Sequence, residues 1–361
     1  MFFLTFDTQD KTKTFSNKIN NKLKNHFLKS AKIALVLVYL VIIAGALVRM
    51  TGSGMGCPDW PKCFGYYIPP TEISQLTWSK NHTFNKGQVI IKDETLLVAK
   101  SNFTTKNAFE PSNWEKYTKH NYANFNAFHT WVEYINRLFG ALAGIACFIT
   151  FIISFWYWKE NKKLVLLSFL VCFLMGFQAW LGKTVVDSVL SPFKITTHMM
   201  VALLIVALIL YIINYCKSTI TEQKFESNFN KLLIIGMLIT VIQIVMGTQV
   251  RQHIDNEVKN GVTASILWLQ NPTIIFYLHR SFSIIVLVLN GYLYWQNKKL
   301  NLGFSKLKIV LLLIGLEVFT GILMFYFDFP FASQPIHLTL ASILFGVQFY
   351  LLLESKKAKL N

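Results

Sequence analysis

Eight apolar runs dominate the chain, and each is about as long as the roughly 20 residues that a helix needs to cross the hydrocarbon of a bilayer. Hydrophobic residues make up 53% of the sequence and charged residues 15%, which is typical of a membrane protein. We therefore predict an all-α integral membrane protein with eight transmembrane helices. The predicted spans cover approximately residues 32–51, 134–157, 164–184, 195–216, 231–250, 273–296, 307–327 and 336–353.

The lysines are unevenly distributed between the segments that join these runs. If the eight helices alternate, the lysine-rich segments all lie on one side, and the positive-inside rule makes that side the cytoplasm. We therefore expect both termini in the cytoplasm. We attribute the net charge of +17 to the lysines of the cytoplasmic segments and expect no nucleic acid as partner. No short apolar region with a small-residue cleavage site opens the chain, so a signal peptide is not expected.

The four arginines lie on the opposite side from most lysines. Arg49, Arg137, Arg251 and Arg280 each lie near the outer end of an apolar run. A guanidinium binds carboxylates in a bidentate manner, so this distribution favours an anionic ligand near the outer surface. Snorkelling to the interface is the alternative for any one of them.

Short motifs recur in the two halves of the chain. The segment 133–137 (Glu-Tyr-Ile-Asn-Arg) returns as 276–280 (Phe-Tyr-Leu-His-Arg), and His198 matches His337. Both halves cross the membrane in the same order, so matched positions are expected at the same depth. We predict two pseudo-repeated four-helix bundles. The expected division is a poorly ordered basic tail (1–31), an amino-terminal bundle (32–216), a cytoplasmic linker (217–230), a carboxyl-terminal bundle (231–354) and a cytoplasmic tail (355–361).

One long outer loop, residues 52–131, interrupts the first half. It begins with turn-forming residues and contains Cys57 and Cys63, which an oxidising outer face would join in a disulfide. A redox-active dithiol and two reduced thiols remain alternatives. Residues 88–99 predict a small hairpin, and residues 113–130 a surface helix that leads into the second span.

Four polar residues near the outer helix starts carry the predicted chemistry. His279 and His337 would each project an imidazole into the second bundle, which is how a porphyrin iron receives two axial ligands. Arg280 and Arg251 would then face the propionates. Zinc would require further protein ligands nearby. In the first half, His198 is matched with Asn136, a poor iron ligand, so we expect one protein ligand there.

Three further residues near these positions have open roles. His129 lies two turns before Asn136 and could replace it only if the porphyrin sits higher. Glu133 lies on the same face as Asn136 and is a candidate proton acceptor. The alternative is a structural role, because the helix dipole stabilises a carboxylate at a helix start. Glu317, inside the seventh span, either carries protons or hydrogen-bonds a neighbour.

Together these segments resemble the heme A synthase family over nearly the whole chain. The resemblance rests on residues 48–54, Cys57 and Cys63, 133–137, 182–188 with His198, 249–251, 278–280 and His337. It implies oxidation of a methyl group of heme O to a formyl group with water as oxygen source, in a bacterial-type plasma (inner) membrane. It also implies a resident haem b in the second half and the substrate haem in the first.

The resemblance assigns further roles and partners. Glu133 corresponds to the family's catalytic glutamate, and His198, Arg137 and Arg49 would hold the substrate haem. The family's histidine corresponds to Asn136, where this sequence departs from the pattern. Expected partners are membrane lipid, heme O synthase, cytochrome oxidase assembly factors and an unnamed electron acceptor; a homo-oligomer stays open.

Two other functions compete with this interpretation. A two-haem membrane cytochrome b would transfer electrons without altering its haem, and would carry ligands in both halves and on both membrane sides. A haem carrier would need the same pocket without turnover. Extraction of the pigment separates the three, because only the enzyme converts heme O.

Overall fold

The structure is a computed structural model that describes residues 8–120, 123–217 and 222–359, with the backbone alone up to residue 23. Eight of its helices are long and apolar enough to cross a membrane, which confirms the predicted fold class. They are α1 (Thr8–Met50), α2 (Ala127–Ser154), α3 (Lys162–Asp187), α4 (Pro192–Cys216), α5 (Ser227–Lys259), α6 (Ile274–Lys299), α7 (Leu307–Tyr326) and α8 (Ser333–Ala358).

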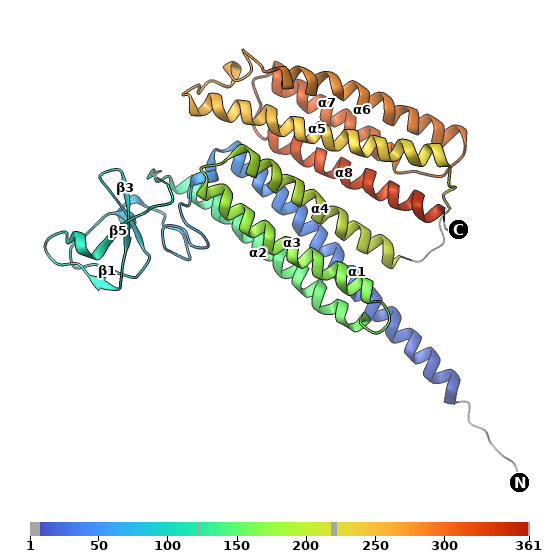
Figure 1. Ribbon diagram of the computed structural model, residues 1–361, viewed down its shortest axis with the longest axis horizontal. Helices are drawn as coiled ribbons and strands as arrows, with labels where there is room; N and C mark the ends of the chain where they lie inside the picture. Colours follow the sequence, from blue (N-terminus) through green and yellow to red (C-terminus); the bar gives the residue numbers. More distant parts are fainter. Residues whose placement is uncertain (1–7, 121–122, 218–221, 360–361) are drawn as a thin grey trace, which may run out of the picture.

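The helices pack as two groups of four (Figure 1). In the first group α1 packs on α2, α2 on α3, α3 on α4 and α4 on α1, so α2 and α4 face each other across a diagonal. In the second, α5, α6, α7 and α8 close the same kind of ring, with α6 and α8 on a diagonal. This arrangement is consistent with the predicted repeat. It places the four helices that carry the candidate ligands opposite one another in pairs.

The two groups meet mainly where α8 packs against α1 and α4. An apolar cluster at this junction contains Met199, Leu203 and Ala207 of α4, Ile244 of α5 and Phe345 of α8. Accordingly, 56% of the apolar window of α4 and 50% of that of α8 is buried, against 17% for α6. The outer faces of the remaining helices expose apolar side chains because lipid is their solvent.

Two helices extend beyond their predicted spans. α1 begins at Thr8, so the backbone of the basic segment from residue 8 onward continues the helix of the span that follows it; residues 1–7 of the predicted tail lie outside the described residues. α5 ends at Lys259, nine residues after the predicted end of the fifth span at residue 250. This extension carries Asp255 toward the first group of helices.

The outer loop folds as a β-rich lobe at the end of the first bundle opposite the two termini (Figure 1). β2 (Val89–Lys92) and β3 (Thr95–Ala99) form the predicted hairpin, and β5 (Trp114–Lys116) adds a third antiparallel strand. β1 (Thr83–Phe84) pairs with β4 (Phe103–Thr104). Aromatic rings fill the space between the two sheets, with Phe84 and Trp114 buried.

The predicted surface helix over residues 113–130 was wrong. Its first residues pair with β3 as β5, and α2 begins only at Ala127. Trp114 decides this outcome because its indole packs into the aromatic core of the lobe. Asn126 then begins α2 by accepting a hydrogen bond from the backbone N–H of His129 at 3.2 Å, a standard N-cap.

Candidate functional site

The second bundle brings its two histidines together. His279 on α6 and His337 on α8 have ring centroids 6.3 Å apart, with the ring planes at 72°. Bonds from a metal ion to imidazole nitrogen are about 2 Å long, so two imidazoles on opposite sides of one ion have centroids about 6 Å apart. The pair therefore fits two axial ligands of one iron.

The Nδ1 atom of His337 is held by two side chains of α7. Glu317 Oε2 lies 2.9 Å from it, and Thr320 Oγ1 lies 2.8 Å from it. Histidines that bind metals usually have the second ring nitrogen held in this way, which fixes the ring and its tautomer. Nε2 of His337 remains for a ligand, and Glu317 does bond to a neighbour, as one of the two predicted roles requires.

His279 is fixed through its backbone. Gln243 Nε2 on α5 donates a 2.8 Å hydrogen bond to the His279 carbonyl. The Nδ1 atom of the His279 ring is buried and has no partner among the described residues. In the first bundle, Gln178 Nε2 on α3 donates a bond of the same length to the His198 carbonyl. An amide one turn before a glycine thus anchors a histidine in each bundle.

A glycine of the neighbouring odd-numbered helix lies beside each of the four candidate ligands. Such a glycine leaves room for a side chain that a Cβ would crowd. In the first bundle, a Cβ on Gly45 would lie 3.9 Å from Asn136 Oδ1, and a Cβ on Gly182 would lie 3.5 Å from His198 Cε1. In the second bundle, a Cβ on Gly247 would lie 3.2 Å from His279 Cε1, and a Cβ on Gly321 would lie 3.9 Å from His337 Cε1.

The first-bundle site has one histidine and one asparagine. Asn136 Oδ1 and His198 Nδ1 are both buried, and neither finds a hydrogen-bond partner in residues 8–120, 123–217 and 222–359. Buried polar atoms normally have partners, so two such atoms on the α2–α4 diagonal suit a bound polar or metal-containing group. The residues present therefore fit a porphyrin held by one imidazole.

The two sites lie next to each other across the junction. Thr196 Oγ1 lies 3.1 Å from Thr248 Oγ1. Thr196 is two residues before His198, and Thr248 directly follows Gly247, the glycine beside His279. Met199 and Leu338, the residues after His198 and His337, belong to the same apolar cluster. These contacts bring both sites to one level of the helices, as the matched motifs predict.

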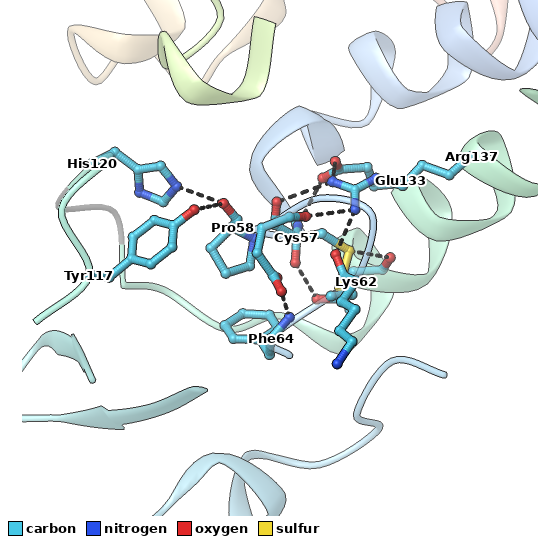
Figure 2. A network of polar contacts seen from close by, with 12 residues as sticks. Cys57, Pro58, Lys62, Phe64, Tyr117, His120, Glu133 and Arg137 are labelled. Atoms are coloured by element: carbon cyan, nitrogen blue, oxygen red, sulfur yellow. Dashed lines mark hydrogen bonds and ion pairs between the residues drawn. A yellow bond between two sulfur atoms is a disulfide. The ribbon is translucent and has the colours of Figure 1, made fainter. Parts of the chain in front are cut away.

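Glu133 is enclosed by the outer loop rather than open to solvent (Figure 2). It is 4% exposed, its Oε1 forms an ion pair with Arg137 Nη2 at 2.6 Å, and its Oε2 accepts the backbone N–H of Cys57 at 2.9 Å. Thr130 Oγ1 donates to the Gly56 carbonyl at 2.7 Å. One face of α2 therefore carries both the carboxylate and the docking points of the loop.

The predicted disulfide between Cys57 and Cys63 is present. Arg137 holds the loop that it closes, because Nη1 donates to the carbonyls of Asp59 and Lys62 at 2.8 and 2.9 Å. Asp59 in turn accepts the backbone N–H groups of the two residues after Cys63. Burial raises the pKa of the Asp59 carboxyl, against the opposing effects of these hydrogen bonds and of Arg137.

The other arginines have different surroundings. Arg49 Nη2 and Arg251 Nη2 lie 2.8 Å from opposite oxygens of Asp255, and Arg251 also donates to the Arg49 carbonyl at 2.9 Å and to Gln334. Arg280 has no carboxylate partner in the described part of the chain; it lies over the Phe325 ring. The expected propionate contacts of the arginines stay a prediction.

Sequence reasoning missed Asp255, Thr320 and Gln243. Only Asp255 left a signal, since it follows Arg251 by four residues, the spacing of an ion pair on one helix. His129 Nδ1 lies 2.9 Å from Ser53 Oγ, and its position two turns before Asn136, roughly 10 Å of helix rise, separates it from the level of Asn136.

Comparison with known proteins identifies chains that are similar along most of their length. The family model described as "Cytochrome oxidase assembly protein" matches residues 30–110 and 99–349. A protein named heme A synthase from Ehrlichia canis (strain Jake) is 25% identical over 90% of this chain and 91% of its own. Proteins of that name from Pelagibacter ubique (strain HTCC1062) and Rickettsia prowazekii (strain Madrid E) are each 24% identical, over 91% and 87% of this chain and 97% and 93% of their own.

The matched ranges contain all eight spans except the first residues of α1 and the end of α8. They also contain Glu133, His198, His279 and His337, so the paired sites lie within the part that the family model describes. The chain is a multi-pass membrane protein. It belongs to the cytochrome oxidase assembly protein family.

Proposed function

We propose that the chain is an oxidoreductase that converts heme O to heme A. The observation that carries this proposal is the pairing of two unequal sites, a two-histidine site and a one-histidine site next to Glu133, within a family whose relatives are named heme A synthase. The methyl group and one water give the formyl group, four protons and four electrons. Two successive two-electron oxidations and loss of water from a geminal diol satisfy this balance.

The second-bundle residues fit a resident haem b. His279 and His337 would hold its iron, and Glu317 and Thr320 keep the His337 ring in one orientation. When bound, this haem supplies one-electron transfer. The expected partners of its propionates are Arg251 on α5 and Arg280 on α6. These helices also carry Gly247 and His279, respectively.

The first-bundle residues would act on heme O as substrate. His198 holds the iron from α4, while Arg49 and Arg137 lie at the outer ends of α1 and α2 on the expected propionate side. Glu133 accepts protons that leave the methyl carbon, and the adjacent Arg137 guanidinium and Cys57 N–H hold its two oxygens in place. The docked loop shields this carboxylate from bulk water, which limits side reactions.

The same proposal includes the setting of the enzyme. Both termini lie in the cytoplasm of a bacterial-type plasma (inner) membrane, and the two sites lie toward the outer face. Heme O synthase and cytochrome oxidase assembly factors are the proposed partners. The electrons pass to an external acceptor that is not named, and a homo-oligomer stays an open possibility. A cytochrome b or a haem carrier would not require a buried carboxylate beside the one-histidine site.

The test is the pigment that the full-length protein makes. The chain is expressed in cells that supply heme O but lack their own conversion activity, and the extracted haems are separated by chromatography. Heme A or its hydroxylated precursor is expected; heme O alone would overturn the enzyme assignment. His279→Ala should abolish the six-coordinate haem spectrum, whereas His82→Ala in the outer lobe should not. An unchanged spectrum in His279→Ala would move the resident haem elsewhere.

A further inference from the structure

The four candidate ligand positions are alike except at one residue. Each projects from an even-numbered helix toward a glycine of an odd-numbered helix, and three hold histidine. Asn136 is the exception, and its Oδ1 is buried without a partner among the described residues. The packing around the position is therefore kept while the side chain that would coordinate iron is absent.

Asparagine and histidine share their Cβ and Cγ positions, but histidine extends further by its ring atoms. An asparagine amide in place of a ligating imidazole stops short of the iron by about the length of one hydrogen bond, roughly 3 Å. An iron bond of about 2 Å and a hydrogen bond of roughly 3 Å together exceed that distance, so a small ligand atom bound to the iron would lie beside the amide, at hydrogen-bond distance from it. An amide N–H can donate to a bound ligand, and polar groups in such a pocket determine which ligands bind.

The described residues around Asn136 offer no replacement ligand. His129 lies two turns before Asn136, roughly 10 Å of helix rise, and both carboxylate oxygens of Glu133 are engaged by Arg137 and by the Cys57 N–H. The nearest cysteines are joined in the disulfide. The iron position that faces α2 therefore has no side chain within this set to occupy it.

We propose that Asn136 leaves the α2 side of the first-bundle iron open to a small exogenous ligand and holds that ligand through its side-chain amide. The inference rests on the proposed function, since it concerns the site that takes heme O. The ligand class is water-sized or a small linear anion. His198 is then the single protein ligand, and the first bundle differs in coordination from the second.

The experiment uses the full-length protein loaded with ferric heme O in detergent and titrated with azide. Haem stoichiometry is measured by the pyridine haemochrome method, and spin state by absorption and electron paramagnetic resonance. Wild type should contain two haems, one low-spin and insensitive to azide, and one high-spin that becomes low-spin as azide binds. Asn136→His should make both haems low-spin without azide and weaken azide binding at least tenfold.

Asn136→Leu separates the hydrogen bond from the open position. It should retain two haems and a high-spin signal but bind azide several-fold more weakly, while Asn107→Leu in the outer lobe should match wild type. Two haems that are both low-spin and insensitive to azide in wild type would overturn this inference alone. Equal azide affinity in wild type and Asn136→Leu would overturn the role of the amide. A chain that takes up only one haem would overturn the proposed function as well.

Discussion

At the scale of single residues, the site depends on what each carboxylate contacts. Glu133 is buried and Glu317 half-buried, each near a candidate haem position, and they have different partners. Glu133 faces an arginine and a backbone N–H, which hold its oxygens in position for the proton transfer that we propose. Glu317 faces an imidazole, which favours orientation of a metal ligand. The two residues therefore predict different phenotypes.

Glu133→Gln should abolish heme A formation while leaving haem binding intact. The amide keeps an acceptor for the Cys57 N–H but cannot take a proton, and general-base catalysis contributes about 10²–10⁴-fold. The measurement is the ratio of heme A to heme O in extracts, with total haem per chain as the second readout. Glu115→Gln on β5 is the matched control. Retention of more than about a tenth of the activity in Glu133→Gln would contradict the assigned role.

Glu317→Gln should raise the midpoint potential of the resident haem. A carboxylate makes the opposite ring nitrogen of His337 a stronger donor to ferric iron, and loss of such a partner typically costs about 10–100-fold in metal affinity. A redox titration followed at the haem absorption bands measures the shift. Glu94→Gln in the outer lobe serves as control. An unchanged potential would mean that His337 is not a ligand.

At the scale of helices, function depends on how closely neighbours approach. The four glycines beside the candidate ligands lie on α1, α3, α5 and α7, and the space is tightest at Gly247, where a Cβ would lie 3.2 Å from His279 Cε1. Two of these helices, α1 and α5, also meet through an ion pair, because the extension of α5 reaches α1 through Asp255. Two element-level predictions follow from these two kinds of contact.

Gly247→Ala should lower the haem content of the second bundle. The new Cβ would lie 3.2 Å from His279 Cε1, closer than most contacts of a real Cβ, so the ring must move away from its position. Gly291→Ala on α6 is a matched control, since a Cβ there meets nothing within 4 Å. The pyridine haemochrome assay compares the two. Equal haem content in both variants would show that the ring has room to adjust.

Asp255→Asn should loosen the junction of the two bundles. An amide cannot neutralise the guanidinium groups of Arg49 and Arg251, which are 21% and 18% exposed, so about 1–3 kcal/mol of stabilisation is lost. Thermal unfolding in detergent should show a lower Tm than wild type. Asp93→Asn, which removes an exposed pair with Lys92, should change stability by less than about 1 kcal/mol. Equal Tm values for both variants would contradict a stabilising role of Asp255.

At the scale of the whole molecule, the structure separates a lipid-facing exterior from a polar level where the sites lie. The β-rich lobe lies at one end of the first bundle, and both termini extend toward the other end (Figure 1). α4 and α8, the most buried spans, carry His198 and His337 at the junction. The two sites are thus placed together by the helices that contact lipid least.

The orientation in the membrane is testable by fusion. Green fluorescent protein joined after residue 361 should fluoresce, because it folds in the cytoplasm. Alkaline phosphatase inserted at residue 107 should be active, because it requires the oxidising outer side that also favours the Cys57–Cys63 disulfide. The reverse pattern of activities would invert the assigned topology and place both sites toward the cytoplasm.

Much of the fold follows from the sequence because the relevant properties are local. The length of each apolar run decides whether a helix spans the membrane, and turn-forming residues with alternating apolar ones decide the hairpin at 88–99. Local pattern also misled in two places. It assigned residues 113–130 to a helix although Trp114 joins an aromatic core, and it ended the fifth run before Asp255.

The sequence by itself determined the eight spans and the histidines that recur near helix starts, since each depends on residue type and spacing along one segment. It predicted the disulfide as one of three states of Cys57 and Cys63, and the structure decided among them. Only the tertiary structure decided which groups meet. Asp255 pairs with Arg49, which is 206 positions away in the sequence. Glu317 on α7 contacts His337 on α8, and Glu133 accepts a hydrogen bond from the backbone N–H of Cys57 in the loop. Such contacts depend on how helices pack against one another, and no local pattern records that packing.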